Sequence, residues 1–129
     1  MQVWINTYPD KPVDIIRYEY LPDAVPAMAL STIQGTYITA RYITGGHRAE
    51  YQFKLIYRIA PGTSNDKRLK ADELLNQIGE WAMSQHPDLG DGINAVRVEP
   101  TTRSSLFAAY DNGQEDHQIM MKLTYEVNV

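Results

Sequence analysis

Apolar and polar residues alternate most clearly between residues 36 and 59, and this pattern predicts two β-strands. Gly45 and Gly46 divide the stretch, and both can take positive φ, so we expect a hairpin turn at this point. One face of the return strand, 49–59, carries only large apolar or aromatic residues: Tyr51, Phe53, Leu55, Tyr57 and Ile59. The hairpin is therefore predicted to lie in a sheet with one buried face and one face in water.

After residue 60 the apolar spacing becomes helical, which predicts one long amphipathic helix over about 66–86. Residues 63–65 suit an N-cap, and Pro87 marks the end of the helix. Gly79 costs the helix about 1 kcal/mol relative to Ala, which indicates close packing against the sheet. The apolar stripe comprises Ala71, Leu74, Leu75, Ile78, Trp81 and Ala82.

Shorter segments complete the predicted fold. Segment 104–110 fits either a strand or a short helix, and 111–116 is predicted to be a loop with an Asn-Gly turn. The strands are grouped on both sides of one helix, so we predict an α+β fold with a mostly antiparallel sheet, in a single domain spanning 1–129. The further strands are expected at 2–6, 13–20, 28–33, 94–100 and 117–129.

Composition narrows the classes of function. The net charge of -4 and the scattered Lys and Arg residues argue against nucleic acid as the main partner. The absence of cysteine excludes disulfides and thiol catalysis. The sequence contains no apolar run of the roughly 18 residues that span a membrane, and no signal peptide is recognisable, so cytoplasmic synthesis is expected.

The residues that usually carry catalysis or bind metals are not spaced for those roles. His47, His86 and His117 have no partners at the spacing of zinc ligands on one element. No catalytic, cofactor or metal site is therefore predicted, and the chain is not expected to be an enzyme. Acidic residues in two predicted loops do not follow EF-hand spacing; solvated turns are favoured, and a divalent ion that bridges two subunits is the alternative: Asp88, Asp91, Asp111, Glu115 and Asp116.

Nine tyrosines are the most unusual feature of the composition. Their β-propensity explains most of them, and subunit contacts are a second use for an apolar residue with a polar tip. An alternative function is a small-ligand-binding or enzymatic domain with a Tyr- and Trp-lined pocket, for which Trp81, Tyr57 and His117 are the candidates. A third alternative is a regulatory protein that forms a dimer.

Three segments, 28–59, 66–83 and 106–129, resemble in order and texture the minor capsid proteins of long-tailed phages and prophages of Gram-positive bacteria, in the group regarded as tail terminators. The resembling features are a Gly-Gly hairpin of Tyr-rich strands, a helix rich in Leu and Trp, and an A-x-Y-D-N-G-x-E-D loop before a long terminal strand. The family places a helix before its first strand, whereas this sequence begins almost at once with the predicted strand 2–6.

The resemblance implies an α+β sandwich whose copies form a ring, commonly a hexamer, at the head-proximal end of the tail tube. Its implied partners are copies of itself, the tail tube protein and the head-completion protein. DNA would pass through the lumen without sequence-specific binding, and no membrane would be involved. The implied location is the virion, assembled in the cytoplasm of the bacterial host.

Projecting loops are the expected docking elements, because binding residues collect on loops. The candidate loops are 44–49 and 111–117. Substituting Asp111, Glu115 and Asp116 together is expected to leave folding intact and to reduce ring formation or tail joining. The candidate assembly residues are Gly45, Gly46, His47, Arg48, Asp111, Asn112, Glu115 and Asp116.

Overall fold

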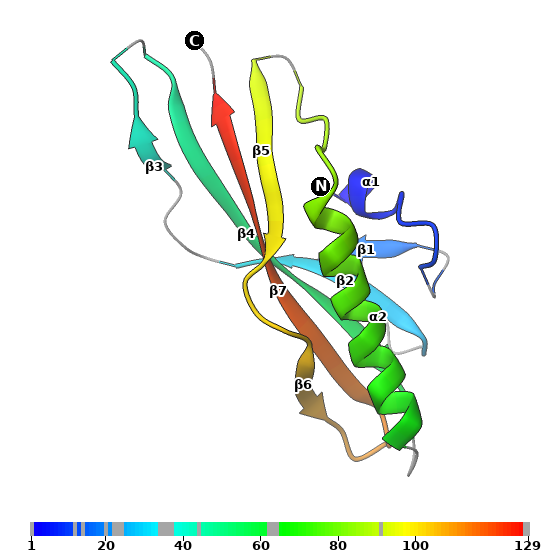
Figure 1. Ribbon diagram of the computed structural model, residues 1–129. Coiled ribbons are helices and arrows are strands. Elements are labelled where there is room, and N and C mark those ends of the chain that lie inside the picture. Colours follow the sequence, from blue (N-terminus) through cyan, green and yellow to red (C-terminus); the bar gives the residue numbers. More distant parts are fainter. Residues whose placement is uncertain are drawn as a thin grey trace.

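The computed structural model describes residues 2–11, 13, 15–19, 21, 25–33, 38–43, 45–61, 65–90 and 92–127. Figure 1 shows a mostly antiparallel sheet with one long helix against it, which confirms the predicted α+β class. The elements in chain order are α1 (Gln2–Ile5), β1 (Ile16–Tyr18), β2 (Ala27–Thr32), β3 (Ile38–Arg41), β4 (His47–Ile59), α2 (Asn65–Met83), β5 (Ile93–Pro100), β6 (Ser105–Ala109) and β7 (Glu115–Val127).

Two long antiparallel strands, β4 and β7, form the centre of the sheet and pair from His47 with Val127 to Ile59 with Glu115. On its outer side, each of these two long strands pairs with two short strands. The first residues of β4 pair with β3 and its later residues with β2, while the start of β7 pairs with β6 and its end with β5. The first strand, β1, lies parallel to β2. We call β3, β5 and the parts of β4 and β7 between them the hairpin half.

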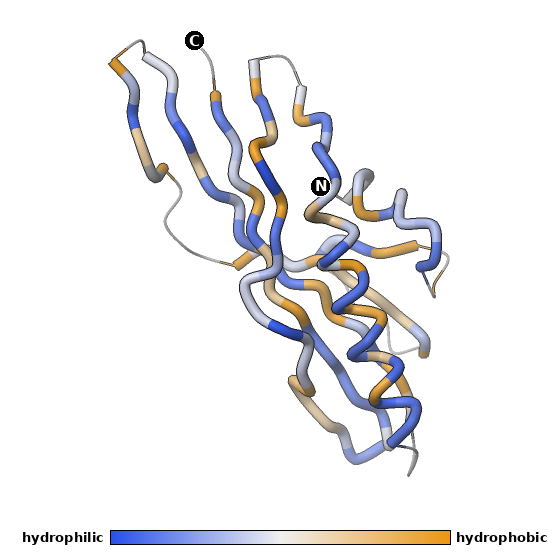
Figure 2. The backbone as a smooth tube through the Cα atoms, in the orientation of Figure 1, coloured by the Kyte–Doolittle hydropathy of each residue, from blue (hydrophilic) through white to orange (hydrophobic). Residues whose placement is uncertain are grey.

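The core lies between α2 and one face of the sheet, and it is built from the alternating residues that the sequence predicts. Phe53 and Leu55 of β4 are fully buried, and the α2 side chains of Leu75 and Ile78 meet them from the other layer. Figure 2 shows apolar positions recurring along α2 and the strands that it covers. Burying each such side chain stabilises the fold by about 1.5–3 kcal/mol before entropy is counted.

Gly79 has the close-packing role that its sequence position indicates. A Cβ atom at this position would lie 3.2 Å from Cδ1 of Ile119 and 3.3 Å from Cβ of Pro100. Such contacts are tighter than ordinary van der Waals separations, so the absence of a side chain lets α2 approach β5 and β7. Pro100 is tolerated as the last residue of β5, an outer strand, because a proline cannot donate to a neighbouring strand.

The predicted strand at 2–6 is wrong, because Gln2–Ile5 forms the short helix α1. The indole of Trp4 stacks on that of Trp81 at 5.2 Å, and the ring of Tyr8 meets Trp81 edge-on at 5.2 Å. Ile5 is fully buried. Tyr8 lies beyond α1, but a tight turn continues the helix toward it: the Thr7 N–H donates to the Trp4 carbonyl at 2.9 Å and the Tyr8 N–H to the Ile5 carbonyl at 3.2 Å. In so short a segment, the alternating pattern did not distinguish helix from strand.

Other element boundaries also differ from the predictions. The described part of the predicted strand 13–20 contains only β1, and Asn6 closes its outer edge: its side chain accepts from the Ile16 N–H at 2.7 Å and donates to the Ile16 carbonyl at 3.0 Å. The ambiguous segment 104–110 contains strand β6. The helix ends at Met83, because the Ser84 N–H bonds the Trp81 carbonyl in a tight last turn. The proposed caps at 63–64 lie outside the described residues.

Candidate functional site

The β3–β4 turn projects from the hairpin half, as predicted. The Tyr42 N–H donates to the Gly46 carbonyl at 2.9 Å, and the Gly45 N–H donates to the Tyr42 carbonyl at 3.1 Å. Gly45 has a φ of 97°, a conformation that favours glycine. Ile43 is fully exposed at the tip. The described residues of the turn, 42–43 and 45–46, therefore present an apolar side chain to solvent.

His47 and Arg48, both predicted to belong to this loop, are instead the first residues of β4. The Arg48 guanidinium donates to the Glu126 carboxylate at 2.7 Å, and the Tyr42 hydroxyl donates to the same oxygen at 3.2 Å. These hydrogen bonds, that from Arg48 first, lower the pKa of Glu126. The contacts connect the projecting turn to the end of β7 and help to position it.

The second candidate loop is shorter than predicted. The Tyr110 N–H donates to the Gln114 carbonyl at 2.9 Å, and Gly113 takes a φ of 85°. Asp111 and Asn112 are exposed in this turn, as a docking role requires. The β7 strand already begins at Glu115, so the placement of Glu115, Asp116 and residue 117 in a projecting loop is wrong.

Asp116 is 2% exposed and pairs across the sheet with Arg58 of β4. Nε of Arg58 donates to one carboxylate oxygen at 2.8 Å and Nη2 to the other at 3.0 Å. The Tyr110 hydroxyl adds a 2.7 Å bond to the second oxygen, and the Arg58 guanidinium lies over the Tyr110 ring at 5.2 Å. This two-point geometry is the strong form of an Arg–carboxylate pair. Asp116 therefore connects the start of β7 to β4 and to the residue that follows β6.

Glu115 faces the helix and is 8% exposed. The Arg68 guanidinium of α2 binds its carboxylate, with an Nη2–Oε2 distance of 2.7 Å. The nearly buried His117 extends this contact: its Nε2 lies 3.3 Å from Glu115 Oε1, and its Nδ1 lies 2.9 Å from Oδ1 of Asp72. The Ser104 hydroxyl donates to the same Asp72 oxygen at 2.7 Å. We call Arg68, Asp72, Ser104, Glu115 and His117 the helix-pinning cluster.

The order of contacts in the helix-pinning cluster differs from that of a nucleophilic triad. In a triad the imidazole lies between the serine and the acid. Here Ser104 and His117 both bind the same oxygen of Asp72, so the acid lies between them. The geometry fits a connection between the first turns of α2, the start of β7 and the segment before β6.

Glu115 gives the cluster a pH dependence. Its pKa lies below the usual 4.5, chiefly because Arg68 donates to the carboxylate, with His117 adding to the effect and burial opposing it. Since the pKa is lower in the folded state, the stabilisation is present above about pH 4.5 and is lost as the pH falls through the folded-state pKa. We expect the free energy of unfolding to decrease from about pH 5 to pH 3. Urea titrations across this range should show a shallower decrease in Glu115→Gln; an unchanged slope would contradict this assignment.

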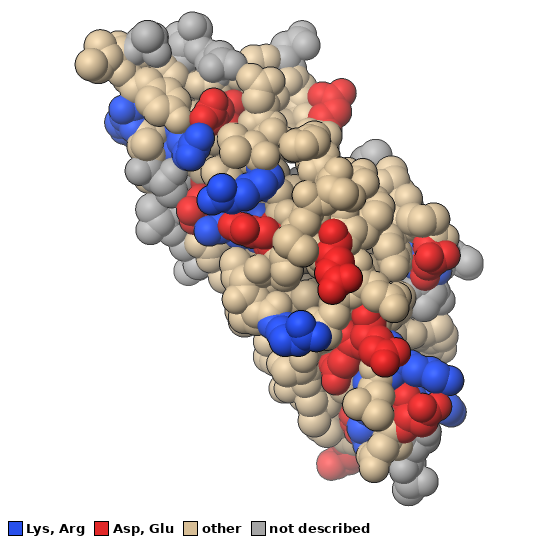
Figure 3. All heavy atoms as spheres, in the orientation of Figure 1, with Lys and Arg blue, Asp and Glu red and all other residues tan. Residues whose placement is uncertain are grey.

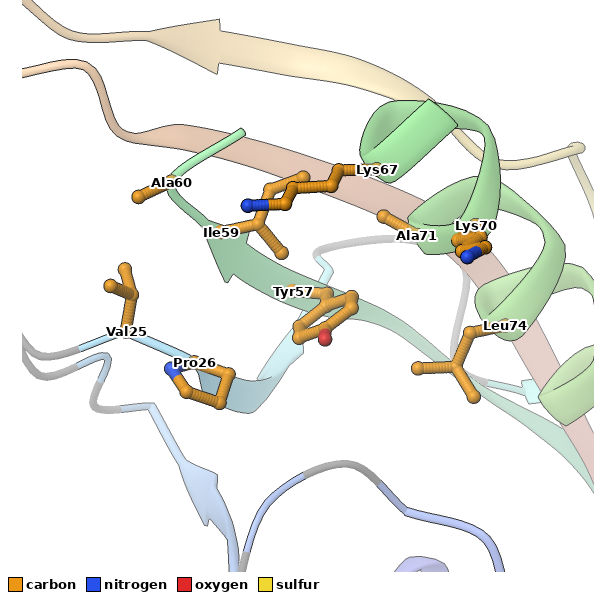
Figure 4. A pocket seen from close by; sticks show the side chains of 9 residues that line it. All are labelled: Val25, Pro26, Tyr57, Ile59, Ala60, Lys67, Lys70, Ala71 and Leu74. Atoms are coloured by element: carbon orange, nitrogen blue, oxygen red, sulfur yellow. The ribbon is translucent and has the colours of Figure 1, made fainter. Parts of the chain in front are cut away.

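The three residues proposed for a Tyr- and Trp-lined pocket do not share a cavity. Trp81 packs against Trp4, and His117 lies in the helix-pinning cluster. Tyr57 is the cross-strand partner of His117 and lines a cavity of about 490 Å³ at the first turns of α2. Figure 4 shows the Tyr57 ring between Pro26 and Leu74 in this cavity.

Within the described ranges, no group of three or more His, Asp or Glu residues is arranged to hold a metal ion, and no helix is long and apolar enough to cross a membrane. Figure 3 shows acidic and basic side chains interspersed over the face that carries α2. Comparison of the sequence with protein-family models and with curated proteins gives no match.

Proposed function

We propose that this chain is a structural assembly subunit whose copies form a ring, as expected for a tail terminator at the head-proximal end of a phage tail tube. The observation that carries the proposal is the hairpin half of the sheet. Figure 1 shows that the β3–β4 hairpin, the end of β7 and the start of β5 extend beyond the C-terminal end of α2. An extension of this kind gives a subunit a surface for contacts with its neighbours.

The outer strands of the hairpin half suit contacts between identical copies. Among the described residues, β3 and β5 are the outermost strands there. Both run antiparallel to their central neighbours, and β4 runs antiparallel to β7, so β3 and β5 run in opposite directions. The β5 edge of one copy can therefore add to the β3 edge of the next as an antiparallel pair. Because the two edges differ, the contact is heterologous and closes into a ring when the rotation between copies permits.

The tip of the hairpin adds an apolar contact to these edges. Ile43 is fully exposed, and Tyr42 next to it is partly exposed. Covering an isoleucine side chain is worth about 1.5–3 kcal/mol, so a neighbouring copy that packs on the tip would gain substantially. In this proposal the tail tube protein and the head-completion protein dock on the two rims of the ring, DNA passes through the lumen, and the protein resides in the virion.

Native mass spectrometry at low and high protein concentration, with negative-stain images of the same samples, tests the proposal. We expect closed rings of about six copies. The variant Ile43→Asp should shift the population toward monomers, because it places a charge where the neighbour supplies an apolar surface. Leu69→Asp is the matched control, since Leu69 is an exposed apolar residue on α2 outside the hairpin half.

Two outcomes would overturn the proposal. A closed dimer at every concentration would favour a regulatory protein instead. Monomers that stay monomeric at high concentration and in the presence of the tail tube protein would remove the basis for a ring. If rings form but Ile43→Asp and Leu69→Asp affect them equally, the hairpin tip is not the contact.

A further inference from the structure

A cavity of about 490 Å³ lies between the first turns of α2, the end of β4 and the start of β2. Apolar side chains make most of its wall: Val25, Pro26, Ile59, Ala60, Ala71 and Leu74. Tyr57 supplies a half-buried aromatic ring and a hydroxyl. The volume and the apolar lining with few polar groups are those of small-molecule sites.

Among the described residues that line this cavity, both charged side chains are lysines. Lys67 and Lys70 line it, and Figure 4 shows the Lys67 side chain extending across it toward Ile59. Lys70 also contacts Asp66 at 3.2 Å, but both side chains of that pair are about three-quarters exposed, so the pair is weak and can rearrange. The positive end of the α2 dipole lies at the same end of the helix and favours a negative group nearby.

The hydroxyl of Tyr57 carries no charge at neutral pH and so does not repel a negatively charged ligand. Burial raises the pKa of Tyr57 above its usual value of 10.0, so the phenol keeps its proton at neutral pH. A neutral hydroxyl can donate a hydrogen bond to a carboxylate, in addition to those that the two ammonium groups can donate. The cavity therefore combines an apolar wall with a hydroxyl donor and two lysine ammonium groups.

We propose that this cavity binds an amphipathic carboxylate, a molecule with an apolar chain or ring and a single carboxylate group. The apolar part lies against Pro26, Tyr57 and Leu74, and the carboxylate meets the ammonium groups of Lys67 and Lys70. This assignment is independent of ring assembly, because none of the described residues of the hairpin half lines the cavity.

The apolar wall and the lysines predict different selectivities. Each methylene that enters the cavity gains up to about 0.8 kcal/mol, so an extension by two carbons should tighten Kd by about tenfold while space remains. Removal of the carboxylate forfeits charge-assisted hydrogen bonds, which should weaken binding by at least tenfold. A cationic head group of the same chain length should bind more weakly still, because it faces two ammonium groups.

Isothermal titration calorimetry with hexanoate, octanoate and decanoate, below the concentrations at which they form micelles, tests the site. Decanol and decylamine provide the neutral and cationic comparisons. We expect saturable binding of one decanoate per chain, a rise in affinity with chain length, and weaker binding of both comparison compounds. The double variant Lys67→Gln/Lys70→Gln should lower the decanoate affinity by at least tenfold.

Two further variants keep the test specific. Arg41→Gln/Arg103→Gln removes the same charge from two exposed residues outside the cavity and should bind decanoate like the unaltered protein. Ala60→Trp fills the cavity from an exposed position and should abolish binding with the fold intact, as checked by circular dichroism. Absence of saturable decanoate binding, or binding that neither the lysine variant nor Ala60→Trp weakens, would overturn the proposal. Equal affinity for decanol and decanoate would overturn its carboxylate component.

Discussion

Replacing Asp116 by Ala should lower the free energy of unfolding by about 3–5 kcal/mol, the usual cost of removing one partner of a buried ion pair. The carboxylate accepts two hydrogen bonds from Arg58 and one from the Tyr110 hydroxyl, and only 2% of the residue is exposed. The alanine variant would leave the Arg58 guanidinium without its carboxylate in a place where water cannot fully replace it.

Urea unfolding followed by circular dichroism and tryptophan fluorescence measures the effect. Glu126→Ala is the matched control, because it removes the acid from the more exposed pair with Arg48, in which the side chains are 39% and 32% exposed. Loss of that pair should lower the free energy of unfolding by no more than about 1 kcal/mol. The double variant Arg58→Met/Asp116→Leu should recover much of the lost stability, since apolar residues can replace a buried pair. Equal losses in Asp116→Ala and Glu126→Ala would contradict the buried-pair account.

This expectation changes how the second candidate loop can be tested for assembly. The sequence alone predicts that substituting Asp111, Glu115 and Asp116 together leaves folding intact. In the structure Glu115 and Asp116 hold the sheet and the helix together, so the triple variant should unfold more easily. Asp111, which is exposed in the turn, is the position where a change reports on docking rather than stability. Asn112 is less suitable, because its side-chain oxygen accepts from the Gln114 N–H at 3.0 Å and helps to form the turn.

The pattern of apolar residues predicted secondary structure best where the periodicity of a strand or of a helix continued for many residues. The strand β4, the strand β7 and the helix α2 were predicted close to their observed bounds, because each carries a long, regular apolar face. The order of strands in the sheet was not predictable. The pairing of β4 with β7 joins segments far apart in the sequence, and nothing local specifies that each long strand shares its outer side between two short ones.

The buried polar contacts were missed for a different reason. Glu115 and Asp116 follow an Asn-Gly turn, and two consecutive acids there are typical of a solvated loop. Once β7 begins at Glu115, the alternation of a strand directs the two carboxylates to opposite faces. One meets Arg68 and the other meets Arg58.

A local signal for the helix-facing contact does exist. Arg68, Asp72 and Asn76 repeat at four-residue intervals and form a polar row beside the apolar stripe of α2. All three engage residues outside the helix: Arg68 binds Glu115, Asp72 binds His117 and Ser104, and Asn76 accepts from the Ser104 N–H at 2.9 Å. A polar row adjacent to a buried stripe can thus indicate buried polar partners, although it does not identify them.

Gly79→Val should lower the free energy of unfolding by roughly 2–3 kcal/mol, the upper part of the range for overpacking. The first atom of any side chain at this position already lies 3.2 Å from Ile119 and 3.3 Å from Pro100. Ile119 is fully buried, and the ring of Pro100 is rigid, so neither neighbour can move away freely. The two additional methyl groups of valine must push α2 away from the sheet or adopt a strained rotamer.

Helix propensity alone predicts the opposite sign, because glycine is the poorer helix former by a few tenths of a kcal/mol. Glu80→Val separates the two effects, since it places the same β-branched residue at the neighbouring, exposed position of α2. Urea unfolding of both variants should show a loss of no more than about 1 kcal/mol for Glu80→Val and a distinctly larger loss for Gly79→Val. A Gly79→Val protein as stable as the original would mean that the contact between α2 and Pro100 is looser than the distances indicate.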